Sequence, residues 1–358
     1  NGSKIIIPLS GGLDSRLIAL TLKRLKYENV LCISYGTEGN KDSIRSRETA
    51  EKLGFPWEMI PYTKQQHVSK ARDDKFWRFS EYASNGTSLP HIDDWIALNQ
   101  FRNKFRDLSD AVFMPGHTGD FISGGHLKYL NYAFDDHHES SNEPRRSIID
   151  KHYSLWGSIL KDELLATILN NRISDVLEKL NLSGNLNKAQ AYEFWEWQER
   201  QSKYIVNSVR SYEFHGYQWR IPLWSTQFVR FWSETPLMLK YDQSLYKDYL
   251  ISFDDYGIYS DIKLTTNKTS KTNINNNHFK KFAKQTLNKT PLASNLLKKR
   301  SIRKKFEYQY DNHPLGMPLQ YDRQSYVKNH YSKRHHVSLW AKEFIEKQYD
   351  FSIEKMIG

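Results

Sequence analysis

The stretch IPLSGGLDSR, near the start of the chain, carries the side chains that most plainly suggest chemistry. Ser10 and Ser15 offer hydroxyl donors, and Asp14 adds a carboxylate. Gly11 and Gly12 permit positive φ and let a ligand approach the backbone. A helix beginning here would aim its free N–H groups and its dipole at the loop, which favours phosphate. Because Asp14 alone would repel phosphate, the pattern predicts Mg²⁺ between the two.

This loop differs from the common nucleotide-binding motifs. The chain contains neither the G-x-x-x-x-G-K-[ST] pattern of Walker-type ATPases nor the dinucleotide fingerprint after a strand. The purely structural alternative is a glycine turn followed by a capped helix.

The elements that would position the loop follow from hydrophobic patterning. The first 115 residues alternate apolar runs with helix-like stretches, which predicts an α/β fold with a doubly wound parallel sheet. The expected strands are KIIIP, ending at Pro8, then NVLCISYG, WEMIPY and DAVFMPG. One expected helix, KDSIRSRETAEKLG, has Ile44, Ala50 and Leu53 on its apolar side and stops at Gly54. Ligands bind such sheets at the carboxyl ends of strands, where the strand order switches.

Four parts are expected along the chain. Residues 1–145 form the α/β core, and residues 146–260 form a mainly helical part that completes the site. Residues 261–306 read as a basic, Asn/Lys-rich insertion or linker, and residues 307–358 as a C-terminal helical segment. The leucine, methionine and tryptophan stripes of the helical part are interpreted as core.

Charge is unevenly distributed over the 358 residues. The formal net charge is +11, but residues 263–305 hold thirteen Lys and Arg and no acid. The remainder carries 39 basic and 41 acidic residues, so the basicity belongs to this segment. It is either a solvated insertion or a patch that contacts a polyanion such as a lipid headgroup, an anionic glycan or RNA.

Cys32 is the single cysteine, and it lies in the apolar run VLCISY. It forms no internal disulfide, and we expect it to pack in the core. No apolar run approaches the roughly 18 residues of a membrane span. The expected location is therefore cytoplasmic.

The opening loop resembles the pyrophosphate loop of the N-type ATP pyrophosphatases, and PLSGGLDS is most similar to the asparagine synthetase branch. The resemblance implies the adenine-nucleotide alpha-hydrolase fold and cleavage of ATP between its α and β phosphates. It covers roughly residues 4 to 255. It implies that Ser10, Gly11, Gly12 and Ser15 cradle pyrophosphate, with Asp14 as a Mg²⁺ ligand.

Later motifs extend the resemblance in chain order. In ISYGT, Tyr35 and Gly36 are implied to hold the adenine, with Pro8 lining its other side. The loop PGHTGDFISGGH resembles the family's S-G-E-G-x-D-E-x-F-G-G-Y and places Gly116 in register. It also makes Asp120 the second implied Mg²⁺ ligand.

Two cations complete the implied ATP site. Arg220 and Pro222 match the family's R-x-P-F-L-D motif, so Arg220 is implied to face the nucleotide. Lys247 matches the lysine of K-x-x-L-R, which contacts phosphate and stabilises charge on the leaving group.

Several positions depart from the family pattern. His117 stands where the family has a glutamate that assists nucleophilic attack, and imidazole can serve as a general base. Phe121 replaces an acid, and Trp224 and Ser225 replace leucine and aspartate. These changes argue against plain aspartate as the acceptor and predict an aromatic pocket for a sugar ring or a peptide.

The nitrogen source is open. Glutamine-dependent relatives begin with a glutaminase domain whose nucleophile is an N-terminal cysteine, whereas residue 1 here is Asn. This start fits four alternatives: a piece of a longer protein, free ammonia, a partner glutaminase or another nucleophile. We expect a piece of a longer protein.

Three functional hypotheses result. The first is an ATP-dependent amide-forming ligase that adenylates a carboxylate on a small molecule, sugar acid or peptide, with polysaccharide tailoring among its possible roles. The second is an RNA-modifying enzyme with the same loop, supported by the basic segment alone. The third is a degenerate nucleotide-binding module, for which His117 and Phe121 are the argument.

Overall fold

The computed structural model describes residues 2–129, 143–156, 159–180, 185–262, 291–328 and 335–349. The basic segment 263–305, for which a solvated insertion and a polyanion contact both stay open, lies largely outside these residues: 263–290 are not described, and neither are the side chains of 291–299.

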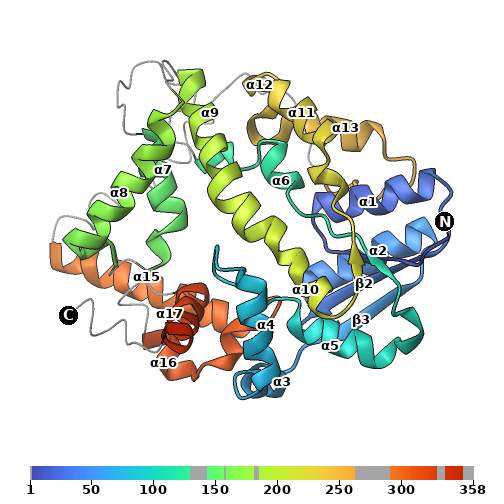
Figure 1. The fold of residues 1–358 in the computed structure, drawn as a ribbon, viewed down its shortest axis with the longest axis horizontal. Helices are drawn as coiled ribbons and strands as arrows, with labels where there is room; N and C mark the ends of the chain where they lie inside the picture. The colour runs from blue at the N-terminus through green and yellow to red at the C-terminus, as the bar shows by residue number, and fades with distance from the viewer. Residues whose placement is uncertain are drawn as a thin grey trace.

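A five-stranded, all-parallel sheet forms the centre of the fold, in the order β3-β2-β1-β4-β5 (Figure 1). The strands are β1 (Ile5–Pro8), β2 (Val30–Gly36), β3 (Trp57–Pro61), β4 (Val112–Phe113) and β5 (Gln218–Trp219). The four predicted strands and the doubly wound α/β class are confirmed. The fifth strand is only two residues long, too short to carry a periodic signal.

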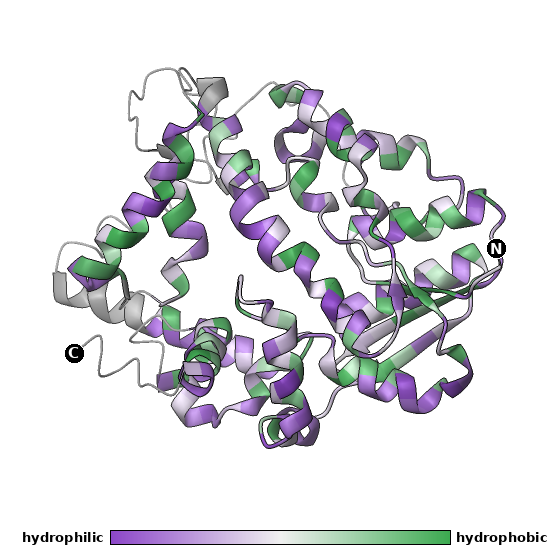
Figure 2. Cartoon of the chain, in the orientation of Figure 1, coloured by the Kyte–Doolittle hydropathy of each residue, from purple (hydrophilic) through white to green (hydrophobic). Residues whose placement is uncertain are grey.

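Helices cover both faces of the sheet because β1 is apolar on both sides. Ile5 and Ile7 face one cluster, which contains Leu20 of α1, whereas Ile6 faces the other, which contains Phe79 of α4. The helices of the sheet half are α1 (Leu13–Arg24), α2 (Lys41–Leu53), α3 (Lys64–Lys70), α4 (Asp74–Ser84), α5 (Trp95–Lys104) and α6 (Gly119–Ile122). Their hydropathy alternates along each helix, as expected for helices with one buried side (Figure 2).

Helix α2 begins and ends as predicted, but the residues on its buried side differ from the prediction. Gly54 adopts a left-handed cap, with φ of 69°. Ile44, however, is 51% exposed, and the buried side is formed by Ala50 and Leu53 together with small hydroxyl residues. The expectation for Ile44 was wrong, because hydroxyl residues with hydrogen-bond partners can be buried in its place. Ser43 and Thr49 donate to carbonyls of the preceding turn, and Ser46 bonds to Ser34 on β2.

A long helical path crosses the molecule beside the sheet (Figure 1). It consists of α9 (Asn185–Trp195), the π-helical η5 (Glu196–Ile205), η6 (Val206–Val209) and α10 (Arg210–Phe214). With α7 (Glu143–His152) and α8 (Glu163–Glu178), α9 encloses a separate small core. Next come η7 (Pro222–Trp224), α11 (Thr226–Glu234), α12 (Leu237–Lys240) and α13 (Ser244–Ser252).

The C-terminal helices return to the sheet half. They are α15 (Pro291–Asn312), α16 (Arg323–Lys328) and α17 (His336–Tyr349). The N–H of Thr37, just after β2, donates to the carbonyl of Pro314 at 2.7 Å. This packing needs Gly36, because a Cβ there would lie 2.3 Å from the Pro314 oxygen.

Two smaller expectations were also tested. Cys32 is fully buried, and burial raises the pKa of its thiol to about 12, as expected for core packing. Within the described ranges, no helix combines the length and apolarity that crossing a membrane requires.

Candidate functional site

The candidate site lies where the strand order changes direction. Strand β1 pairs with β2 on one side and with β4 on the other, so chain connections leave β1 and β4 in opposite directions. The loop of Ser10 and Gly11 follows β1, and the loop of Gly116 and His117 follows β4. The predicted residues thus emerge side by side at the switch point.

The first loop folds on itself through its hydroxyls. The N–H of Ser10 donates to Oγ of Ser15 at 3.1 Å, and the two hydroxyl oxygens lie 3.2 Å apart. The N–H of Gly12 donates to Oγ of Ser10, and α1 begins at the next residue. The loop therefore presents hydroxyls at a helix N-terminus, as the sequence predicts.

One of the two reasons predicted for the glycines, positive φ, is wrong; the other, close approach of a ligand to the backbone, stays a prediction. Gly12 has a φ of −71°, and Gly11 is not among the described glycines with positive φ. At Gly11, a Cβ would lie 2.8 Å from Oδ1 of Asp42 on α2. The loop therefore packs closely against the exposed side chain of Asp42, and positive φ plays no part.

The two predicted carboxylates come together. Oδ2 of Asp14 accepts the backbone N–H of Asp120 at 2.9 Å, and Oδ1 of Asp14 accepts the hydroxyl of Tyr246 at 2.9 Å. Gly119 makes this approach possible, because a Cβ there would lie 2.5 Å from the Asp14 carboxyl carbon. Gly116 packs similarly, with its Cβ position 2.6 Å from the backbone nitrogen of Ser15. Tyr246 was not predicted, although it directly precedes Lys247.

A buried chain of side chains continues from Asp120. His126 donates from Nε2 to Oδ2 of Asp120 at 3.2 Å, and from Nδ1 to Glu196. Glu196 has no exposed surface and also accepts from Lys151, from His152 at 2.6 Å and from Tyr192 at 3.1 Å. Sequence reasoning missed this network, because its members lie on four separate elements. A signal was present: a glutamate that falls on the buried side of a helix needs a partner.

The electrostatics of the two carboxylates differ. Burial, with a further contribution from the charge of Asp120, raises the pKa of Asp14 to about 7. Burial acts in the same direction on Asp120, but the hydrogen bond and charge of His126 outweigh it and hold the pKa of Asp120 below its ordinary value. Burial opposes protonation of His126, yet its bonds to Asp120 and Glu196 raise its pKa. The two carboxylates thus favour the protonated form of His126, which lies between them.

Two adjacent carboxylates suit a cation that also binds phosphate. In the described part of the chain, no group of three or more His, Cys, Asp or Glu is arranged as a metal site. Asp14 and Asp120 would therefore need phosphate and water oxygens as further ligands, which is the way Mg²⁺ commonly binds. Burial and, to a smaller extent, the charge of Asp120 raise the pKa of Asp14, and a bound cation would oppose both effects. The residues present fit Mg²⁺ with a nucleotide.

His117 lies in the same loop but away from the Asp120 network. Its Nδ1 is 3.4 Å from the hydroxyl of Ser208 on η6. Burial lowers the pKa of His117 to about 4, so its imidazole is neutral at neutral pH and can accept a proton.

The two predicted cations lie at the rim. Lys247 on α13 is 21% exposed and pairs with Asp242 at 3.0 Å, one residue from the tyrosine that contacts Asp14. Arg220 follows β5, is exposed, and donates to the carbonyl of Trp219 at 2.7 Å. The structure places both near the carboxyl edge of the sheet, without a described contact to Asp14 or Asp120.

The residues expected to hold adenine are partly occupied by protein contacts. The hydroxyl of Tyr35 donates to Asp94, and its ring stacks on Tyr62 at 5.8 Å. Gly36 is covered by the carbonyl of Pro314. Pro8 ends β1, pairs with Ile33 and keeps partial exposure.

Three other positions that depart from the family pattern make separate contacts within the protein. Phe121 packs edge-on against His126, with ring centroids 5.6 Å apart. Trp224 lies nearly parallel to Trp197 of η5 at 6.5 Å, at an angle of 30°. Ser225 caps α11 by accepting the N–H of Phe228.

Comparison with known proteins agrees with this geometry. The family model described as asparagine synthase matches residues 4–342. A search of curated proteins found no match. Enzymes of the matched family are ATP-dependent, amide-forming synthetases. The chain belongs to the asparagine synthase family.

Proposed function

We propose that this protein is a ligase that activates a carboxylate on an acceptor as its acyl-adenylate and then forms an amide. One observation carries the proposal: Asp14 and Asp120, from loops more than 100 residues apart in the chain, meet beside a helix N-terminus at the switch point of the sheet. Such a pair is suited to a nucleotide with its cation, and family membership supports ATP in that place.

The proposed reaction has two steps. An oxygen of the acceptor carboxylate attacks the α-phosphorus of ATP, and pyrophosphate leaves. Ammonia or an amine then attacks the activated carbonyl carbon, loses a proton, and displaces AMP, which keeps the acceptor oxygen. Asp14 and Asp120 would hold Mg²⁺, which supplies charge neutralisation on the phosphates when bound. The hydroxyls and N–H groups of residues 10–15 hold the pyrophosphate.

Two further residues have proposed roles in these steps. Lys247 neutralises charge that develops on the leaving pyrophosphate, for which it must exchange Asp242 for phosphate. His117, neutral at neutral pH, accepts the proton that the incoming amine loses.

Pyrophosphate release from Mg-ATP with ammonium tests the proposal, across aspartate, uronic acids, peptides and amino-acid-derived carboxylates. Release should require an acceptor, and Asp120→Asn should reduce it at least a hundredfold. Asp110→Asn is the matched control, because this exposed carboxylate precedes the opposite end of β4. Equal loss in both variants, or normal release by Asp120→Asn, would contradict the proposed metal site.

A further inference from the structure

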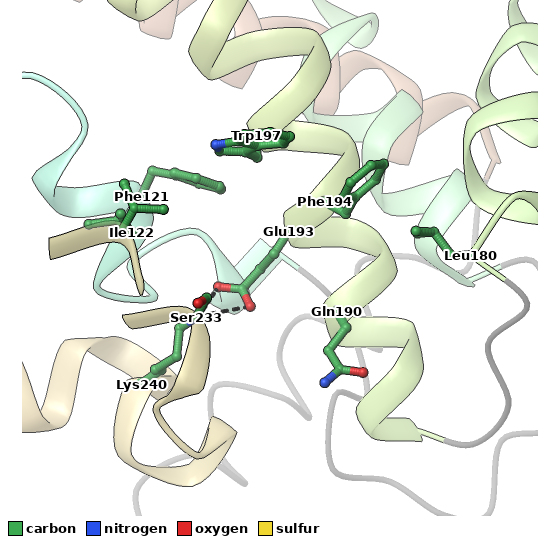
Figure 3. Close-up of a pocket in the computed structure, with 10 residues that line it drawn as sticks. Phe121, Ile122, Leu180, Gln190, Glu193, Phe194, Trp197, Ser233 and Lys240 are labelled. Atoms are coloured by element: carbon green, nitrogen blue, oxygen red, sulfur yellow. Dashed lines mark hydrogen bonds and ion pairs between the residues drawn. The ribbon is translucent and has the colours of Figure 1, made fainter. Parts of the chain in front are cut away.

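A cavity of about 360 Å³ lies between α6, the α9–η5 helical path and α11 (Figure 3). Six apolar side chains line it: Phe121, Ile122, Leu180, Phe194, Trp197 and Val229. Its volume lies in the range of small-molecule sites, which are mostly apolar with a few polar groups.

The cavity adjoins the proposed reaction centre. The N–H of Phe121 donates to Oδ1 of Asp120 at 2.7 Å, so the cavity wall begins one residue from that carboxylate. On the opposite wall, Trp197 directly follows Glu196, the residue that anchors His126. A molecule whose carboxylate lies beside Asp120 can therefore place a side group in this cavity.

The polar part of the wall carries no unbalanced charge. Glu193 and Lys240 form a two-pronged ion pair, with Nζ 2.6 and 2.9 Å from the two carboxylate oxygens. The two side chains are only 18% and 8% exposed. Lys240 is the one cation among the described lining residues, and it is already neutralised. A second carboxylate, such as that of aspartate, would find no free cation among these lining residues, only the neutral side chains of Gln190 and Ser233.

Part of the wall is aromatic. Trp197 is 40% exposed, and its ring centroid lies 5.8 Å from that of Phe194. Flat rings in a wall favour planar or branched apolar groups, which bury much area there at small cost in side-chain freedom. The wall therefore selects by shape and apolarity.

From these contacts we infer that the acceptor is a carboxylic acid with an aromatic or branched-aliphatic side group, which enters this cavity. The inference rests on the proposed function for the carboxylate's chemistry, but the cavity's occupancy is a separate property. It disfavours aspartate and uronic acids among the acceptors that the sequence leaves open.

The test uses 4-fluorophenylacetate as a probe, followed by fluorine NMR in the full chain. Saturable line broadening is expected, and Val229→Trp, which fills the cavity, should weaken binding at least tenfold. Phe231→Trp is the matched control on the same helix, because residue 231 is 55% exposed and absent from the lining. Phe194→Ala is the second variant, in case Val229→Trp does not fold. It removes a ring without filling space and should also weaken binding of the probe.

Two further measurements separate the inference about the cavity from the proposed function. Competition by aspartate or glucuronate as strong as that by phenylacetate would overturn the inference, as would unchanged probe binding in a folded Val229→Trp or in Phe194→Ala. Mg-ATP binding is measured in the same samples. Probe binding without Mg-ATP binding would support the inference about the cavity and refute the proposed function. Mg-ATP binding without probe binding would support the proposed function and refute the inference about the cavity.

Discussion

Glu196 is completely buried, yet it is bonded to His126, Lys151, His152 and Tyr192. Its charge is stable there, because these partners outweigh burial and hold its pKa well below the ordinary value. Glu196 in turn holds His126 in the position from which its ring contacts Asp120. At the residue scale, the proposed metal site is therefore set by a carboxylate that cannot touch the metal itself.

Replacing Glu196 with Gln should weaken this orientation. The Mg²⁺ concentration for half-maximal pyrophosphate release should rise about 10- to 100-fold. Glu199→Gln is the control, since Glu199 pairs with Lys203 one turn along the same helix. The thermal midpoint is measured in parallel, and an unchanged Mg²⁺ requirement in a folded Glu196→Gln would refute the positioning role.

Lys247→Met tests the proposed stabilisation of the leaving group. Loss of one preorganised charge that acts in the transition state should reduce kcat by about 10²- to 10³-fold, with a smaller effect on KM for ATP. Lys104→Met, which removes an exposed ion pair with Glu58, should leave both constants unchanged. An effect of Lys247→Met on KM alone would assign the lysine to binding.

At the element scale, Gly124 connects the loop after α6 to α12. It has a φ of 93°, and a Cβ there would lie 2.2 Å from the carbonyl oxygen of Lys240. Gly39 also has positive φ, at 71°, but nothing lies within 4 Å of its Cβ position. Substitutions at these two glycines therefore distinguish the cost of backbone strain from the cost of steric conflict.

Gly39→Ala should cost about 1 kcal/mol of the free energy of unfolding, through strain alone. Gly124→Ala should cost about 3 kcal/mol or more, because backbone must also move. Denaturant unfolding of both variants measures the difference. Equal costs would mean that the loop and α12 are not held together as the structure describes.

At the scale of the whole molecule, acid should destabilise the fold. Burial lowers the pKa of five histidines to between about 2 and about 4: His67, His117, His215, His335 and His336. Each stays neutral in the folded state while it gains a proton in the unfolded state below about pH 6.5, so stability falls as the pH falls from 6.5 toward 4. Asp14 and Glu343, with pKa values raised to about 7, act in the opposite direction but are fewer.

The thermal midpoint should therefore drop between pH 6.5 and pH 4.5. His67→Leu should make the drop shallower, because His67 is fully buried and a leucine cannot be protonated. A flat midpoint over this range, or an identical slope in the variant, would contradict the assignment.

Local patterns predicted much of this architecture. The strand pattern of KIIIP and NVLCISYG predicted β1 and β2 because both are buried on two faces. The resemblance to the family's loops, rather than the strand pattern, assigned Asp14 and Asp120 to one site. Long-range pairing was beyond such patterns: β5 has two residues, and Glu196 meets His126 across 70 positions. The prediction that Ile44 is buried was wrong for a related reason. Buried hydroxyl groups can replace apolar residues on a helix when they have hydrogen-bond partners.

The most direct test of the central claim follows one oxygen atom. An acceptor that supports pyrophosphate release is labelled with ¹⁸O in its carboxylate and incubated with Mg-ATP and ammonium, and the nucleotide product is analysed by mass spectrometry. The account predicts AMP that carries one ¹⁸O from the acceptor, because that oxygen is bonded to the α-phosphorus in the acyl-adenylate. ADP as the product, or AMP without the label, would contradict it.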